Sequence, residues 1–113
     1  MHELGVAEEI LKIVTEQAKS KEAKAVTKVK IQVGEATMIE EGSLLFCLGE
    51  LSKETIAQGA NIEIEKVPAK FKCPTCKKTF TVNNLDFSCP SCKVVSLEMV
   101  SGKELLVESI EIE

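Results

Sequence analysis

Four cysteines in the C-terminal half of the chain have the spacing that most clearly indicates chemistry. They form two CxxC pairs, Cys73 with Cys76 and Cys89 with Cys92, and twelve residues separate the pairs. Each pair can turn both of its sulfurs inward on one tight turn. Two such turns supply four thiolates for a tetrahedral zinc ion, with Zn–S distances of about 2.3 Å. The sequence therefore predicts one Zn(II) bound by Cys73, Cys76, Cys89 and Cys92.

Other uses of these four cysteines fit the pattern less well. Redox dithiols normally accompany a βαβ pattern, and a duplicated CPxC is a poor match to them. Disulfides do not suit a reducing compartment. Rubredoxin-like iron is the chief competitor, because a tetrahedron of four sulfurs suits both metals. With all four ligands used, no coordination position stays open, so the zinc is expected to be structural rather than catalytic.

The fifth cysteine, Cys47, is separate from this cluster. It lies three residues after Leu44 on an expected helix. We interpret it as a buried small apolar residue rather than a reactive thiol.

His2 is the only histidine of the chain. A free α-amine, the following backbone nitrogen and the imidazole can chelate one metal in adjacent fused rings, a set that favours square-planar Ni(II) or Cu(II). A residue as large as His2 should also block removal of Met1, so the amine would belong to Met1. Glu3 would either add a ligand or complement the positive end of a helix. From the chemistry alone, a frayed and solvated terminus remains the stronger interpretation.

The elements that must position these residues follow from hydrophobic periodicity. Helical spacing runs over residues 4–18, and a second helix is expected over about 40–58 with Gly59 as its stop. Strict alternation predicts strands at 27–33, at 62–67 before Pro68, and at 105–112 with an irregularity at Ser109.

This order predicts an α+β fold: a small three-stranded sheet with two helices on one face, plus an inserted zinc-ribbon-like module that carries the four cysteines. The expected division is a discontinuous nickel-binding α+β domain, residues 1–68 and 100–113, and a zinc-binding module, residues 69–99. Within the module, 77–82 and 87–88 are expected to be short strand-like pieces.

Composition narrows the class of protein. The 113 residues contain no Trp and no Tyr, so the core must be aliphatic. No apolar stretch approaches the length of a membrane span, and acids stand where a signal peptide needs bases, so a cytoplasmic protein is expected.

All 14 basic residues are Lys. The absence of Arg counts against nucleic-acid recognition, and the lysines around the cysteines are expected to offset thiolate charge.

Several segments together resemble the HypA family of hydrogenase-maturation nickel chaperones, and the resemblance covers essentially the whole chain. Met1-His2-Glu3-Leu4 is similar to the opening of that family, and Val33-Gly34-Glu35 to the exit of its first strand. Gly59-Ala60, the strand at 62–64, Pro68 and the paired CxxC turns follow in the family's order. Two departures are Gly5, where Ser is common, and Ala36-Thr37, where a larger apolar residue and Ser are usual. Neither removes a ligand.

The resemblance implies a carrier and not an enzyme. It implies a Ni(II) site at His2, with the Met1 amine and Glu3 beside it, and zinc at the four cysteines. It also implies cooperation with the GTPase HypB and delivery of nickel to the large subunit of [NiFe]-hydrogenase. With one His, no Ser/His or Cys/His nucleophilic set is available, and no glycine-rich phosphate loop is present.

Two other function classes compete with this interpretation. A zinc-ribbon module that binds nucleic acid or assists transcription should show a basic face with Arg or stacking aromatics. This chain offers only the lysines of 66–78 with Phe71 and Phe80. A redox dithiol protein is the third interpretation, which retention of zinc under mild oxidant would exclude.

Overall fold

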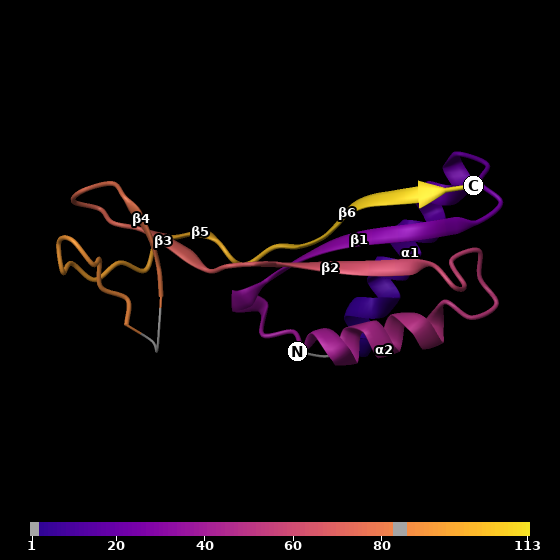
Figure 1. Ribbon diagram of the computed structural model, residues 1–113, viewed down its shortest axis with the longest axis horizontal. Coiled ribbons are helices and arrows are strands. Elements are labelled where there is room, and N and C mark those ends of the chain that lie inside the picture. The colour runs from indigo at the N-terminus through magenta and orange to yellow at the C-terminus, as the bar shows by residue number, and fades with distance from the viewer. Residues whose placement is uncertain (1–2, 83–85) are drawn as a thin grey trace.

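The computed structural model describes residues 3–82 and 86–113 and shows two regions joined end to end (Figure 1). The molecule measures 54 × 25 × 17 Å. Its elements are α1 (Glu3–Ser20), β1 (Val26–Gly34), the short 3₁₀ helix η1 (Glu35–Thr37), α2 (Glu41–Leu51), β2 (Asn61–Val67), β3 (Lys70–Lys72), β4 (Thr79–Thr81), β5 (Met99–Ser101) and β6 (Leu105–Ile112). Among the described residues, no helix combines the length and apolarity that a bilayer span requires.

The larger region is the predicted three-stranded sheet with two helices. Its strand order is β2-β1-β6, with β1 parallel to β2 and antiparallel to β6. The register with β6 shifts between the pairs Lys30–Ser109 and Ile31–Val107, leaving Glu108 as an extra residue. This β-bulge is the irregularity that the sequence predicted near Ser109.

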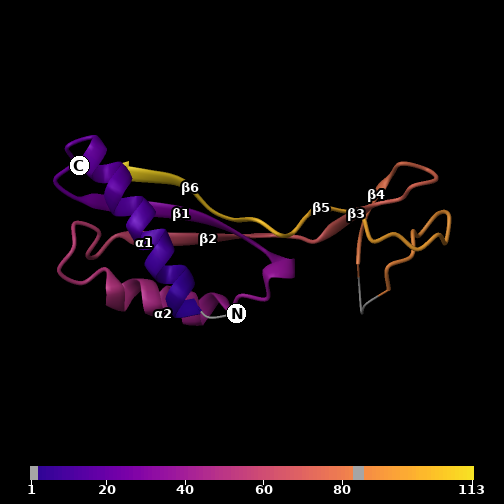
Figure 2. The same ribbon diagram turned by 180° about the vertical axis from the view of Figure 1, so that it is seen from behind.

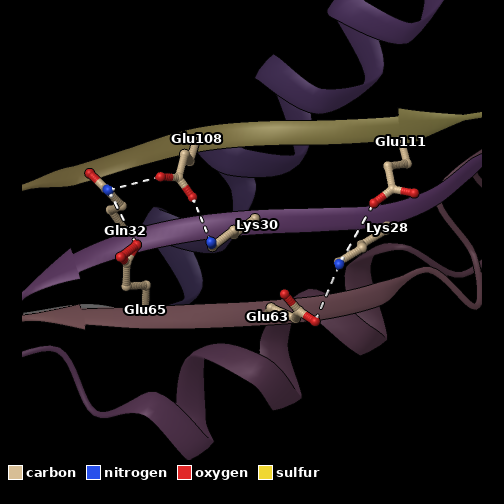
Figure 3. Close-up of polar contacts among 7 residues, drawn as sticks. All are labelled: Lys28, Lys30, Gln32, Glu63, Glu65, Glu108 and Glu111. Carbon is tan, nitrogen blue, oxygen red and sulfur yellow. Dashed lines mark hydrogen bonds and ion pairs between the residues drawn. The ribbon is translucent and has the colours of Figure 1, made fainter.

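Alternation along β1 separates the two faces of the sheet. Val29, Ile31 and Val33 are buried under the helices, whereas the residues between them lie on the opposite face. Figure 3 shows that outer face. Lys28 pairs with Glu63 and Glu111 at 3.4 and 3.6 Å, and Lys30 pairs with Glu108 at 3.3 Å. Ion pairs between neighbouring strands therefore line this face of the sheet, while both helices pack on the other face.

The two helices lie on the same face of the sheet, as predicted, and close an aliphatic core (Figure 2). The buried stripe of α1 is Ala7, Ile10, Val14 and Ala18. The sequence predicts a stripe of Leu4, Ala7, Leu11, Val14 and Ala18, widened by Ile10 and Ile13. In the structure Leu4 is instead 53% exposed and Leu11 only partly buried. Ile10, at the side of the predicted stripe, is buried, so the core-facing side of α1 is centred closer to Ile10 than to Leu4.

The second helix ends earlier than the sequence predicted. It stops at Leu51, and residues 52–59 form turns instead of two further helical turns. Thr55 explains the change: its hydroxyl donates to the carbonyl of Ser52 and accepts from the N–H of Ala57. Such local side-chain bonds compete with the helix. Glu54 has φ of 64°, which breaks the helix again before Gly59.

Short strands form the smaller region, in the order β4-β3-β5. Phe71, on the central strand, meets Phe80 with ring centroids 6.3 Å apart and Phe87 at 5.3 Å with the rings perpendicular. The expected piece at 77–82 is β4, and Ser88 makes only an isolated bridge with Val95. The three-residue strands β3 and β5 were not predicted.

The two regions meet where backbones pass in close contact. A Cβ at Gly34 would overlap the carbonyl of Gly102, and Gly102 itself, with φ of 112°, lies against Ala69. The carboxylate of Glu35 accepts from the N–H of Ala69 at 2.8 Å, and the Ala36 N–H donates to Gly102 at 2.7 Å. Only glycine permits this approach, so the junction is a packed joint rather than a loose linker.

Candidate metal centres

Two equivalent turns carry the four cysteines. In the first, the N–H of Lys77 donates to the Cys73 carbonyl at 3.0 Å, and the Cys73 N–H donates to Lys78. In the second, the N–H of Lys93 donates to the Cys89 carbonyl at 2.8 Å, and the Cys89 N–H donates to Val94. The lysine after each second cysteine has positive φ, 65° and 62°. Both turns therefore use the same backbone path to turn their sulfurs inward.

The sulfur positions fit a tetrahedral metal. All four Sγ atoms lie within 4.8 Å of one another, and the Sγ atoms of Cys76 and Cys89 are 3.7 Å apart. A tetrahedron with Zn–S bonds of about 2.3 Å has sulfur–sulfur edges of about 3.8 Å. A disulfide would need about 2.05 Å, and all five cysteines are free thiols. The cluster thus has the dimensions of a four-thiolate metal site.

The four thiols of the cluster differ in how readily they lose their protons. The N–H of Cys76 donates to Cys73 Sγ at 3.5 Å, and this bond lowers the pKa of the Cys73 thiol to about 7. Interaction with the Cys76 side chain, followed by burial, raises the pKa of the Cys92 thiol to about 12. Four thiolates packed together repel one another without a cation, so metal binding must release protons.

Apolar packing and hydrogen bonds position the four cysteines, and nearby lysines offset the negative charge of their thiolates. Cys73 and Cys89 are buried with Phe71 and Phe80, whereas Cys76 and Cys92 are half-buried. The buried Ser96 hydroxyl donates to the carbonyl of Lys72 and accepts from Glu98 N–H at 3.2 Å, which ties the chain after the second turn to the strand before the first. Exposed lysines stand at 77, 78 and 93. The cluster fits a structural zinc ion.

Cys47 is only half-buried. It packs at the edge of the aliphatic core, as the sequence predicted for a small apolar residue, without the full burial that was expected.

The predicted nickel ligands are only partly placed. His2 and Met1 lie outside the described residues. Glu3, the first residue of α1, accepts a hydrogen bond from the backbone N–H of Glu40 at 3.1 Å, and this bond lowers the pKa of its carboxyl. Its carboxylate therefore ties the start of α1 to the start of α2.

Glu40 is a residue of this region that sequence analysis missed. Its carboxylate accepts from the N–H of Ser43 and so caps α2, which lowers the pKa of Glu40. The sequence does carry a sign of this cap, a carboxylate three residues before Ser43. The predicted helix began at about residue 40, so Glu40 was taken as part of the helix and not as its cap. The N-terminal ends of both helices thus meet, each with a carboxylate that complements its positive end.

Comparison with known proteins settles the family. Residues 1–112 match the family model described as "Hydrogenase/urease nickel incorporation, metallochaperone, hypA". The chain belongs to the HypA family. A hydrogenase maturation factor HypA of Caldanaerobacter subterraneus is 39% identical over the full length of both chains. One of Dehalococcoides mccartyi is 37% identical over the whole chain and 95% of that protein.

Solved HypA structures share the fold. The solution structure of the Ni metallochaperone HypA from Helicobacter pylori has a TM-score of 0.70, with 23% identity over 99% of this chain and 97% of that one. A second HypA solution structure gives 0.75 at the same identity, over 100% of this chain and 97% of that one. The resemblance seen in the sequence is confirmed, and HypA membership favours a nickel carrier over the nucleic-acid and redox interpretations.

Proposed function

We propose that this chain binds Ni(II) at its N-terminus and delivers it for [NiFe]-hydrogenase maturation, while the four cysteines hold a structural Zn(II). The observation that carries the proposal is the match of residues 1–112 to a family of nickel-inserting metallochaperones, because that match includes His2. The family description also names urease, which makes urease a candidate for a second client.

Zinc is assigned to Cys73, Cys76, Cys89 and Cys92. Bound there, the metal would cross-link the two turns and neutralise part of the thiolate charge. The protein supplies the N–H donors at Cys73 and the lysines at the rim. No coordination position is left for a substrate, so this centre has a structural role and the proposed activity is transport, not catalysis.

Nickel is assigned to the Met1 amine, His2 and the neighbouring Glu3. The bond between Glu3 and Glu40 supports this choice, since it anchors the residue that follows His2 on the rest of the domain. Nitrogen donors on a chain end also suit a carrier, because an acceptor's ligands can replace them one at a time. The nickel site and the zinc site then belong to different regions, residues 1–68 with 100–113 and residues 69–99, each with its own metal.

The partners we propose are the GTPase HypB and the large subunit of [NiFe]-hydrogenase, in the cytoplasm. A maturation factor for a nickel enzyme must meet the protein that receives the metal. The lysine-rich but Arg-free zinc region gives no reason to add a nucleic acid.

The test separates a terminal chelate from an ordinary histidine ligand. Adding two residues before Met1 converts the amine into a chain amide, which must lose a proton to bind a metal. Ni(II) titration by calorimetry should show loss of high-affinity binding in this N-extended form, nearly as complete as in His2→Ala. Two residues added after Glu113 form the matched control and should leave nickel affinity unchanged.

Zinc content should be the same in all these proteins. Full nickel affinity in the N-extended form would show that the amine is not a ligand. Equal affinity of the wild type and His2→Ala would overturn the assignment of nickel to the N-terminus.

A further inference from the structure

The outward face of α2 is apolar although the helix lies at the surface. Leu44 and Leu48 face the core, whereas Phe46 is 68% exposed on the opposite side. Helical spacing places Gly42, Leu45 and Gly49 on the same side as Phe46; we call these four residues the Phe46 face. Exposed apolar patches with a polar rim mark sites of protein interaction. None of the residues that the structure describes covers Phe46.

The fold does not require the two glycines of this face. Glycine inside a helix is less stable than alanine. A Cβ at Gly49 would meet no atom within 4 Å, and one at Gly42 would meet only the Glu40 carboxylate, at 3.2 Å. The glycines stand four residues before and three residues after Phe46, so bare backbone flanks the exposed ring along the helix. Such a surface suits the close approach of another protein's backbone.

The Phe46 face begins next to the proposed nickel site. Glu40, which caps α2, is the residue whose N–H binds Glu3. Met38, two residues before Glu40, is 81% exposed and has φ of 60°, a conformation that residues other than glycine rarely adopt. A protein that exchanges nickel by ligand replacement must bring its donors to the chain end. It must therefore also cover the surface beside it.

Charge around the face selects the kind of partner. Glu3, Glu40 and Glu41 lie at the start of α2, and Glu50 on its flank pairs with Lys53 at 2.6 Å. The border of the apolar face is thus mainly acidic. A second copy of this chain would bring two acidic borders together in a two-fold contact. A partner with an apolar pocket bordered by Lys and Arg would match both features.

We propose that the Phe46 face is the docking surface for HypB, which would offer an apolar pocket with a basic border. The inference rests on the proposed function, because it takes HypB as the nickel-exchange partner. Phe46 inserts into the pocket, the glycines allow close contact, and the acidic border steers the approach. A face of four residues gives a small interface, which suits reversible contact between two folded proteins.

Two variants test the face in opposite ways. Phe46→Ser removes the anchor, whereas Gly49→Gln adds bulk on a helix position where no atom is in the way. Leu97→Ser is the matched control, because Leu97 is 75% exposed but lies in the cysteine region. Calorimetry with purified HypB from the same organism should show binding at least tenfold weaker for both variants and unchanged for the control. Each variant alone should keep wild-type Ni(II) affinity, and Gly49→Gln should melt no lower than the wild type.

The outcomes separate the docking surface from the proposed function. Unchanged HypB affinity in both variants overturns the docking surface. So does a wild-type dimer that Phe46→Ser converts to monomers while HypB affinity is unchanged, or a loss of binding confined to the hydrogenase large subunit. If the wild type does not bind HypB, both the partner and the docking surface are wrong, while Ni(II) titration of the wild type still tests the nickel site by itself.

Discussion

The two regions of the molecule reach stability by different means. The α+β domain buries twelve apolar residues between two helices and a sheet, and none of them is a cysteine. The buried cluster of the smaller region consists of Phe71, Cys73, Phe80 and Cys89, so half of it is metal-ligating sulfur. Nine lysines and sixteen acids lie outside residues 69–99, against five lysines and two acids within them. One region carries its own aliphatic core, whereas we expect the other to depend on a bound cation.

This difference suits a carrier that holds two metals for different purposes. A structural metal must stay bound, and four buried or half-buried thiolates linked by backbone bonds favour retention. A transported metal must leave, and donors at a chain end favour exchange. The close packing of Gly34 on Gly102 and of Gly102 on Ala69 holds the two regions together.

Removal of zinc should have the largest effect, and it tests whether the two regions differ in their dependence on metal. With excess chelator, residues 69–99 should lose chemical-shift dispersion in amide NMR spectra, because metal-dependent modules fold with their metal. The signals of β1, β2 and β6 should persist, since their core contains no ligand. Adding zinc back should restore the lost signals. One cooperative collapse of both regions would show that the α+β domain does not stand alone.

The converse change removes core from the larger region. Leu44 is fully buried, and Leu44→Ala should reduce the free energy of unfolding of the α+β domain by about 2–5 kcal/mol. Denaturant melts should show the loss, and zinc content should stay at one per chain. Loss of zinc in this variant would mean that the cysteine region depends on its neighbour for its fold.

A smaller effect is expected at the joint. Gly34→Ala places a methyl group against the carbonyl of Gly102 and should destabilise the protein by about 1–3 kcal/mol through overpacking. Gly5→Ala is the matched control, because a Cβ at Gly5 meets nothing within 4 Å and the change should stabilise α1 by up to about 1 kcal/mol. Equal thermal stability of the two variants would contradict the packed joint.

Hydrophobic periodicity predicted the secondary structure of the long, regular segments. The alternation of β1 and β6, including the bulge near Ser109, and the two CxxC turns were readable because their patterns are local. The end of α2 was not, because Thr55 forms bonds that propensity does not encode. The strands β3 and β5 are three residues long, too short for alternation to show.

The proposed nickel site shows the same limit of sequence analysis. The bond from Glu40 to Glu3 joins residues 37 positions apart, and only the packing of α1 on α2 brings them together. The exposure of Phe46 was not predicted either, because the sequence does not show which side of α2 packs on the rest of the domain. Residue type pointed to the proposed ligands at each site, and the fold showed the neighbours of Glu3 and of the four cysteines.

We propose that nickel and zinc occupy separate sites in separate regions, and a paired metal titration separates the two sites. Untagged wild type, His2→Ala and Cys73→Ala would each be analysed for zinc content and titrated with Ni(II). We expect His2→Ala to lose high-affinity nickel and keep one zinc, and Cys73→Ala to lose zinc and keep nickel affinity. Loss of both metals in either variant would contradict two independent sites.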